Sequence, residues 1–200
     1  MWLKKLLIIS SISFLAIFSS CDVLNQVSQI SNLTKCDFRL ESVQNLNLAG
    51  INVQNVHKMS DLNMFDAANI ATAVSSQKFP LDFTLNIEAR NPNSATAGMT
   101  KIDWILLIDD IEMTRGILDQ QVTIPANNGL AVIPMKMHVD LQKALSGKSG
   151  DAIINFGMNL AGTGNKPTRF TVQMKPTISV NGLPITYPGY VNVKAEYSGH

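Results

Sequence analysis

The feature that most constrains the fold of this sequence is an alternation of apolar and polar side chains over residues 81–90, LDFTLNIEAR. Successive side chains of a β-strand point to opposite faces, so a period of two predicts a half-buried strand with one wet face. The apolar set is Leu81, Phe83, Leu85, Ile87 and Ala89, and the polar set is Asp82, Thr84, Asn86, Glu88 and Arg90. The chain is therefore expected to contain a sheet with one covered face.

This strand is followed by Asn91, Pro92 and Asn93. Proline cannot donate a hydrogen bond to a strand neighbour and fixes its own φ angle, which stops the ladder. Asparagine side chains bond to nearby backbone groups in Asx-turns. The Asn-Pro-Asn motif therefore predicts a strand end and a turn, without charge or catalysis.

Further strand-like segments fill most of the remaining chain and are separated by turn signals such as Asp109-Asp110 and 126–129, ANNG. We predict strands at 38–42, 46–53, 102–108, 111–117, 122–124, 131–141, 154–160 and 170–180. Residues 182–200 form either an edge strand or a loose tail.

One segment has the period of a helix. Apolar residues of 61–77 recur near one side of a helix, Asp61 is a candidate N-cap, and Lys78 and Pro80 end the pattern. Residues 140–150, DLQKALSGKSG, predict a short helical link. Together these patterns indicate an all-β fold, an immunoglobulin or fibronectin-III-like antiparallel β-sandwich of about seven strands with one short inserted helix. A half-open barrel is the alternative.

The N-terminus has the pattern of a bacterial lipoprotein signal. Lys4 and Lys5 precede an apolar run at 6–18, and Ser19-Ser20 precede Cys21. The segment IFSSC resembles a lipobox, which implies that Cys21 carries a diacylglyceryl group and further acyl chains such as palmitate. We predict a signal peptide at 1–20, a lipidated N-terminus and tether at 21–35 and a domain at 36–181. An ordinary cleaved signal is the alternative.

Charge and cysteine content extend this interpretation. Without the signal peptide the chain has fourteen basic and fifteen acidic residues, so electrostatic attraction would not hold it on a membrane. Two or three acyl chains would do so stably. A disulfide between Cys21 and Cys36 is the competing use of the cysteines. No cluster of Lys and Arg follows the signal, which argues against nucleic acid as a partner.

The turn residues also carry a family resemblance. In order they are the strand FTLNIEAR ending in Asn91-Pro92-Asn93, the strand IDWILLIDD, Gly116, Ile124-Pro125, Gly129 and Ile133-Pro134. This series resembles the LEA type 2 family (late embryogenesis abundant group 2, also called the water stress and hypersensitive response or WHy domain), including bacterial lipoprotein members. The resemblance implies a β-sandwich, an association with desiccation or other stress, and structural roles for Asn91, Pro92, Asn93, Gly116, Pro125, Gly129 and Pro134. It implies no catalytic residue.

No other pattern predicts an active site. His57, His138 and His200 lack the spacing of metal ligands, and no Gly-x-Ser-x-Gly elbow occurs. Asp109, Asp110 and Glu112 are interpreted as a solvated turn rather than a cation site, and 162–167, GTGNKP, as a hairpin loop rather than a phosphate loop. We therefore expect no enzyme activity, no cofactor and no metal.

The functional expectation is a non-enzymatic protein of the cell envelope, lipid-anchored to a membrane and facing the periplasm, that acts as a binding or stress-protective module. Its partners would be the membrane and an unidentified envelope protein or apolar ligand. The alternative is a periplasmic carrier of a small apolar ligand or lipid, with helix 61–77 gating a pocket. An adaptable apolar lining for such a pocket, or simply a filled core, is the expected role of Trp104, Met135, Met137, Met158 and Met174.

Overall fold

The computed structural model describes the chain from residue 32 to residue 197 with short gaps; the described residues are 32–54, 56, 59–146, 150–160, 167–180 and 182–197. The predicted signal peptide, Cys21 and the tether up to residue 31 lie outside these residues, as do His57, His200 and most of the loop at 162–167.

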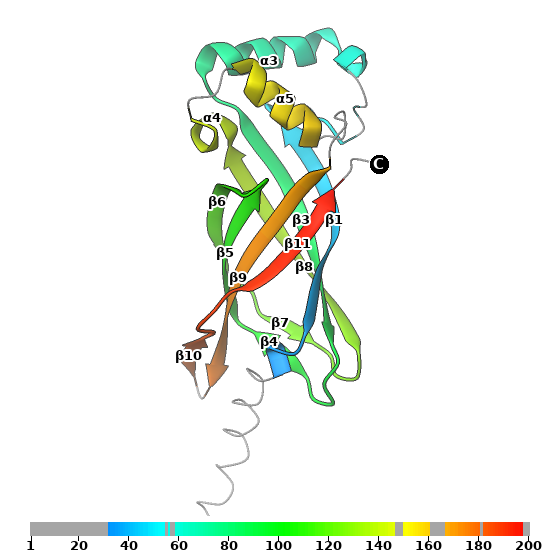
Figure 1. Ribbon diagram of the computed structural model, residues 1–200, viewed down its shortest axis with the longest axis vertical. Coiled ribbons are helices and arrows are strands. Elements are labelled where there is room, and N and C mark those ends of the chain that lie inside the picture. Colours follow the sequence, from blue (N-terminus) through cyan, green and yellow to red (C-terminus); the bar gives the residue numbers. More distant parts are fainter. Residues whose placement is uncertain are drawn as a thin grey trace, which may run out of the picture.

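Two antiparallel sheets form the body of the protein (Figure 1). The first has the order β2-β1-β3-β8, with β1 at Asp37–Leu48, β2 at Ile51–Asn52, β3 at Pro80–Asn91 and β8 at Gly129–Asp140. The second contains β6 (Ile111–Leu118), β5 (Lys101–Ile108) and β9 (Thr168–Val180), and the far edge of β9 pairs with β10 (Leu183–Thr186) and then with β11 (Val191–Tyr197). A two-stranded ribbon joins β4 (Ala97–Met99) to β7 (Val122–Ile124).

The core lies between the two sheets. The apolar side chains that alternate along β3 lie at its centre. Leu81, Leu85, Ile87 and Ala89 are fully buried, whereas the polar residues between them are exposed or half-buried. The ring of Phe83 on β3 meets that of Phe170 on β9 edge-on, with centroids 6.0 Å apart. The predicted facing of this strand is confirmed, and so is the all-β sandwich.

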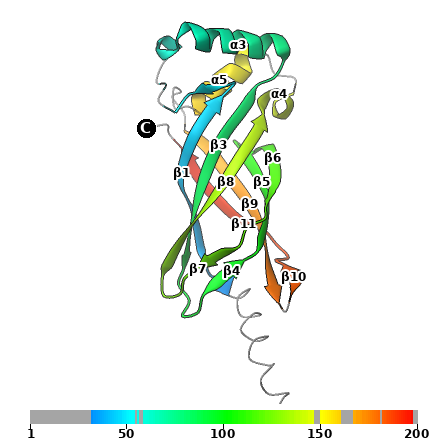
Figure 2. The ribbon, with the colours of Figure 1, turned by 180° about the vertical axis from the view of Figure 1, so that it is seen from behind.

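Helices cover one end of the sandwich, seen at the top of Figure 1 and from behind in Figure 2. They are the 3₁₀ turn η1 (Met59–Asp61), α3 (Met64–Ser76), the single turn α4 (Leu141–Ala144) and α5 (Gly150–Leu160). We call this end the helix end. The helix predicted at 61–77 is present as α3.

The predicted cap of that helix was wrong. Asn63, not Asp61, is the N-cap: its side chain accepts hydrogen bonds from the backbone N–H groups of Phe65 and Asp66, at 2.8 and 3.0 Å. The Asp66 carboxylate accepts in return from the Asn63 N–H at 2.9 Å. This reciprocal capping box fixes the helix start two residues later than Asp61 would.

The strand predicted at 154–160 was also wrong, because residues 150–160 form α5. Ile153, Gly157 and Leu160 are buried, while Ala152, Asn155 and Asn159 are exposed. Buried positions four and three residues apart follow the helical period. The glycine lies against Leu48, since a Cβ atom added to Gly157 would stand 2.6 Å from a Leu48 Cδ atom.

Candidate functional site at the turn end

The opposite end of the sandwich contains most of the motif residues that carry the family resemblance. We call it the turn end and define it by residues 32–36, residues 91–100, residues 121–129 and the last residues of β9, 178–180. Figure 2 shows β4 and β7 at this end, far from α3. The geometry of the turn end determines which of these residues meet and what remains accessible between them.

Asn91 organises this end. It is the last residue of β3, and it is fully buried. Its Nδ2 donates to the carbonyls of Ala95, at 2.9 Å, and Ile124, at 3.1 Å. Its Oδ1 accepts from the backbone N–H and the Nδ2 of Asn93, at 3.1 and 2.7 Å. One side chain therefore joins the end of β3, its own turn and β7.

The turn after β3 interlocks with the turn before β8. The backbone N–H groups of Asn127 and Asn128 donate to the carbonyls of Asn93 and Asn91, at 2.7 and 2.8 Å. Both of these asparagines have a left-handed backbone, with φ of 58° and 63°. Asparagine tolerates that conformation better than most residues do. The two turns thus satisfy each other's backbone groups.

Pro125 and Gly129 complete the second turn. The Gly129 N–H donates to the Ala126 carbonyl at 3.1 Å. A Cβ atom added to Gly129 would lie 2.5 Å from the Pro125 oxygen, so only glycine lets the chain close so tightly. The structure therefore brings Asn91, Pro92, Asn93, Pro125 and Gly129 together.

Gly116 and Pro134 lie elsewhere. Gly116 of β6 pairs with Trp104 of β5, and an added Cβ would stand 2.5 Å from the indole ring, so the glycine makes room for Trp104. Pro134 lies opposite Asn86 on β8, the edge strand of the first sheet, where a missing N–H is tolerated.

The described chain begins at the turn end and is held there. The Asn32 carbonyl accepts from Asn93 Nδ2 at 2.9 Å and from the Cys36 thiol at 3.3 Å. Cys36 is a free, half-buried thiol. Burial, with a smaller contribution from the charge of Asp37, raises the pKa of Cys36 to about 11. At neutral pH the group is a thiol and a poor nucleophile.

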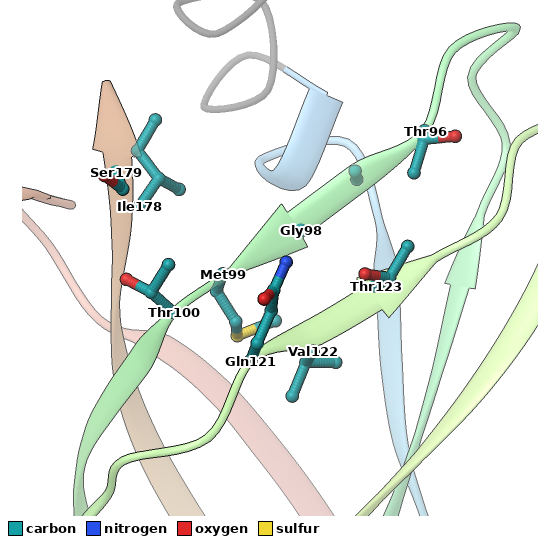
Figure 3. A pocket seen from close by; sticks show the side chains of 10 residues that line it. Thr96, Gly98, Met99, Thr100, Gln121, Val122, Thr123, Ile178 and Ser179 are labelled. Atoms are coloured by element: carbon teal, nitrogen blue, oxygen red, sulfur yellow. The ribbon is translucent and has the colours of Figure 1, made fainter. Parts of the chain in front are cut away.

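A groove lies beside β4 at this end (Figure 3). Its volume is about 240 Å³, and its walls come from β4, from residues 121–123 and from the end of β9. Thr96, Thr100, Thr123, Gln121 and Ser179 supply hydroxyl and amide groups, and none of the residues that line the groove is charged. Sequence reasoning missed this groove, because nothing in the sequence of its separate segments indicates that they meet.

The remaining candidate residues are accounted for by pairing or packing. His138 Nδ1 lies 2.5 Å from an Asp82 carboxylate oxygen on the exposed face of the first sheet. Asp109 and Asp110 pair with Arg169, and Glu112 pairs with Arg115. Within the described ranges, no three His, Cys, Asp or Glu side chains come together as they would around a metal ion.

Four members of the predicted apolar set lie in the core. Met135, Met137 and Met174 are buried between the sheets, and Trp104 is 9% exposed. The side chain of Met158 lies outside those described. These residues therefore serve as core in the structure. None of the described helices is both long and apolar enough to cross a bilayer.

Comparison with known proteins gives weak likenesses. No protein-family model matches the sequence, and no curated protein matches it. Similar solved structures include a protein from Archaeoglobus fulgidus (12% identity, 60% of this chain and 85% of that chain, TM-score 0.35). They also include AT1g01470 from Arabidopsis thaliana (12% identity, 81% and 77%, TM-score 0.36). A third is a candidate late embryogenesis abundant (LEA) protein, At2g46140.1 (13% identity, 94% and 86%, TM-score 0.32). At these scores the likenesses carry no functional argument.

Proposed function

We propose that this protein is a non-enzymatic, lipid-anchored envelope protein whose LEA type 2-like domain acts as a binding or stress-protective module, chiefly against desiccation. The observation that carries the proposal is the interlocked turn end. The residues that resemble the family motif serve there as structure: Asn91 is buried and bonded at every polar atom of its side chain. Motif residues whose side chains and backbones hold two turns together have a structural role, which fits a scaffold better than an enzyme.

The position of the N-terminal entry supports the anchor. The chain reaches the sandwich at Asn32, which Asn93 holds at the turn end. Ten residues lie between Cys21 and Asn32, so their Cα atoms are at most about 40 Å apart. A lipid on Cys21 would therefore keep the turn end within about 40 Å of the membrane. The nearly neutral charge makes the lipid, rather than basic residues, the means of attachment.

Cell fractionation of a Cys21→Ala variant tests the anchor. The variant should leave the membrane fraction and become soluble after cell lysis, because it lacks the acylated residue. Cys36→Ala is the matched control and should stay with the membrane. Equal membrane retention of Cys21→Ala and the unmodified chain, after a high-salt wash, would overturn the proposal.

Drying tests the protective role. A desiccation-sensitive enzyme is dried and rehydrated with the purified protein or with an equal mass of serum albumin. The proposed role predicts that more activity survives with this protein than with albumin. Equal recovery of enzyme activity with both proteins would overturn the protective role. Binding would then be the role to be tested.

A carrier of a small apolar ligand is the second candidate, favoured by the loose attachment of α3. Ala73 is the buried side chain of this helix, while Met64 and Phe65 are 85% and 82% exposed. A helix held by so little buried surface opens at low cost in free energy. Opening would have to create the ligand space, because Trp104, Met135, Met137 and Met174 are packed in the core. A stoichiometric lipid that survives purification would support the carrier.

A further inference from the structure

The second sheet divides at Thr100. We call the space between β4 and residues 177–180 of β9 the fork. Lys101 pairs with Thr177 in the β5–β9 ladder, and the Thr100 N–H also donates to the Thr177 carbonyl, at 2.8 Å. Before Thr100 the chain turns away from β9 and pairs as β4 with β7. After Thr177, β9 continues to Val180. The uncharged groove occupies the space between these two diverging strands (Figure 3).

One wall of the fork is a free strand edge. In an antiparallel ladder, the N–H and C=O of successive residues point alternately to the two neighbouring strands. The Pro176 carbonyl accepts from Tyr187 N–H, on the side of β10, so Thr177 points to the β5 side, and so does Ser179 two residues later. Within the described chain no strand pairs with β9 on that side beyond Thr177. The backbone N–H and C=O of Ser179 therefore point into the groove.

The opposite wall leaves room for a second backbone. Gly98, in the middle of β4, lines the groove without a side chain, and a Cβ atom added to it would meet the backbone of β7, at 3.0 Å from the Val122 oxygen, and no atom of β9. Its place on the wall is visible in Figure 3. A free strand edge beside an open wall is the arrangement that accepts an added strand in β-augmentation.

The absence of charge on the groove walls indicates which kind of peptide strand could bind there. Ten residues line the groove, and their polar groups are hydroxyls and one amide. A charged side chain entering it would lose hydration without gaining a counter-charge. Met99, Val122 and Ile178 are buried beneath, so the floor is apolar. A strand that alternates hydroxyl and small apolar residues matches both the rim and the floor.

We propose that this fork is an acceptor site for one extended, uncharged peptide strand of a partner protein, which hydrogen-bonds to the backbone of Ser179. The proposal rests on the binding role proposed above and names the chemistry of its partner. It places that partner at the turn end, where the described chain begins at Asn32. It makes no use of the membrane, so the test of this site and the test of the anchor fail independently.

The test is an NMR titration of the ¹⁵N-labelled chain with a blocked pentapeptide, acetyl-Thr-Val-Thr-Val-Thr-amide. We expect saturable shifts of the Ser179 and Gly98 amide signals. Two control peptides distinguish backbone pairing from non-specific binding. They are the same sequence with an N-methylated backbone, and acetyl-Glu-Val-Glu-Val-Glu-amide. The N-methylated peptide should bind about tenfold more weakly, the factor that loss of one hydrogen bond to a backbone group gives. The glutamate peptide should also bind more weakly, because its charges would lose hydration without gaining a counter-charge.

A matched pair of variants completes the test. Ser179→Pro removes an N–H that points into the fork and that no described strand uses, so β10 should stay paired and peptide binding should fall about tenfold. Ser179→Ala keeps the N–H and should bind as the unmodified chain does. Unchanged signals of residues 183–186 would show that Ser179→Pro has kept β10 in place.

Three results would overturn the proposal. The first is the absence of a saturable shift at Ser179, and the second is equal binding by the glutamate peptide or by Ser179→Pro. The third is binding that appears only after residues 22–31 are replaced by a Gly-Ser segment. That result would show that the chain's own N-terminal segment, and not a partner, occupies the fork.

Discussion

The two ends of the sandwich are built on different principles. At the turn end, the fully buried side chain of Asn91 and the backbones of two turns bond to one another. At the helix end, α3 leaves Met64 and Phe65 largely exposed and buries Ala73. The turn end depends on particular residues because hydrogen bonds and close approaches have strict geometry. The helix end depends on apolar packing, which tolerates substitution more readily.

The largest effect should follow Asn91→Ala. The change removes four hydrogen bonds and leaves the Ile124 carbonyl buried without this donor. We expect a loss of about 3 kcal/mol in the free energy of unfolding. Urea denaturation measures it, with Thr84→Ala on the wet face of the same strand as control. Equal midpoints for the two variants would remove Asn91 from the centre of the turn end.

Gly129→Ala should come next. The new Cβ would meet the Pro125 oxygen and Cβ, at 2.5 and 2.6 Å, and the oxygen belongs to the backbone, so the turn itself must shift. The expected loss is about 2 kcal/mol, measured in the same way. Ser94→Ala, exposed in the neighbouring turn, is the control. A neutral Gly129→Ala would mean that this turn is not closely packed.

At the helix end the corresponding change, Gly157→Ala, should cost less. Its Cβ would meet the tips of the Leu48 side chain, at 2.6 and 3.0 Å, and a side chain can rotate away. Alanine also favours a helix interior over glycine by about 1 kcal/mol. The net loss should be about 1 kcal/mol. A loss larger than that of Gly129→Ala would reverse the ranking of the two ends.

Phe65→Ser should leave stability within about 0.5 kcal/mol, because the side chain is 82% exposed. Ala73→Ser, at the buried position of the same helix, is the matched variant and should destabilise more. A clear destabilisation by Phe65→Ser would show that this side chain is covered in solution, and so would count against the exposed helix end.

The smallest effect concerns acid. The hydrogen bond from Arg39 lowers the pKa of Glu88 in the folded protein. As pH falls, the unfolded chain therefore takes up this proton first, and the stabilisation is lost from the ordinary glutamate pKa of about 4.3 downward. The difference in urea midpoint between the unmodified chain and Glu88→Gln should be present at pH 7. It should shrink as the pH falls below about 4.3. A difference independent of pH would exclude the ion pair as its cause.

The same contrast explains what the sequence reveals. The alternation of β3 and the stop at Asn-Pro-Asn are local, so residues 81–93 predict their own structure. In α5, residues 153–160 suit both periods: the alternation of Ile154, Phe156 and Met158 suggests a strand. The helix packs Gly157 against Leu48, far earlier in the chain, and no local pattern predicts that contact.

The site was less predictable than the fold. The turn after β3 could be predicted, but its bonds to Ile124 and Asn127 join residues more than thirty positions apart and leave no local pattern. The fork has the same origin, since Thr100 meets Thr177 only through the sheet. Contacts between distant segments depend on topology, which a local pattern does not encode.

Native mass spectrometry of the full-length protein, extracted gently from the membranes of its own host, tests the central claim most directly. The proposed function predicts the mass of a chain that begins at an acylated Cys21, with no other adduct. An unacylated chain would contradict the anchor. A further lipid-sized mass, released on denaturation, would contradict the protective role and support the carrier.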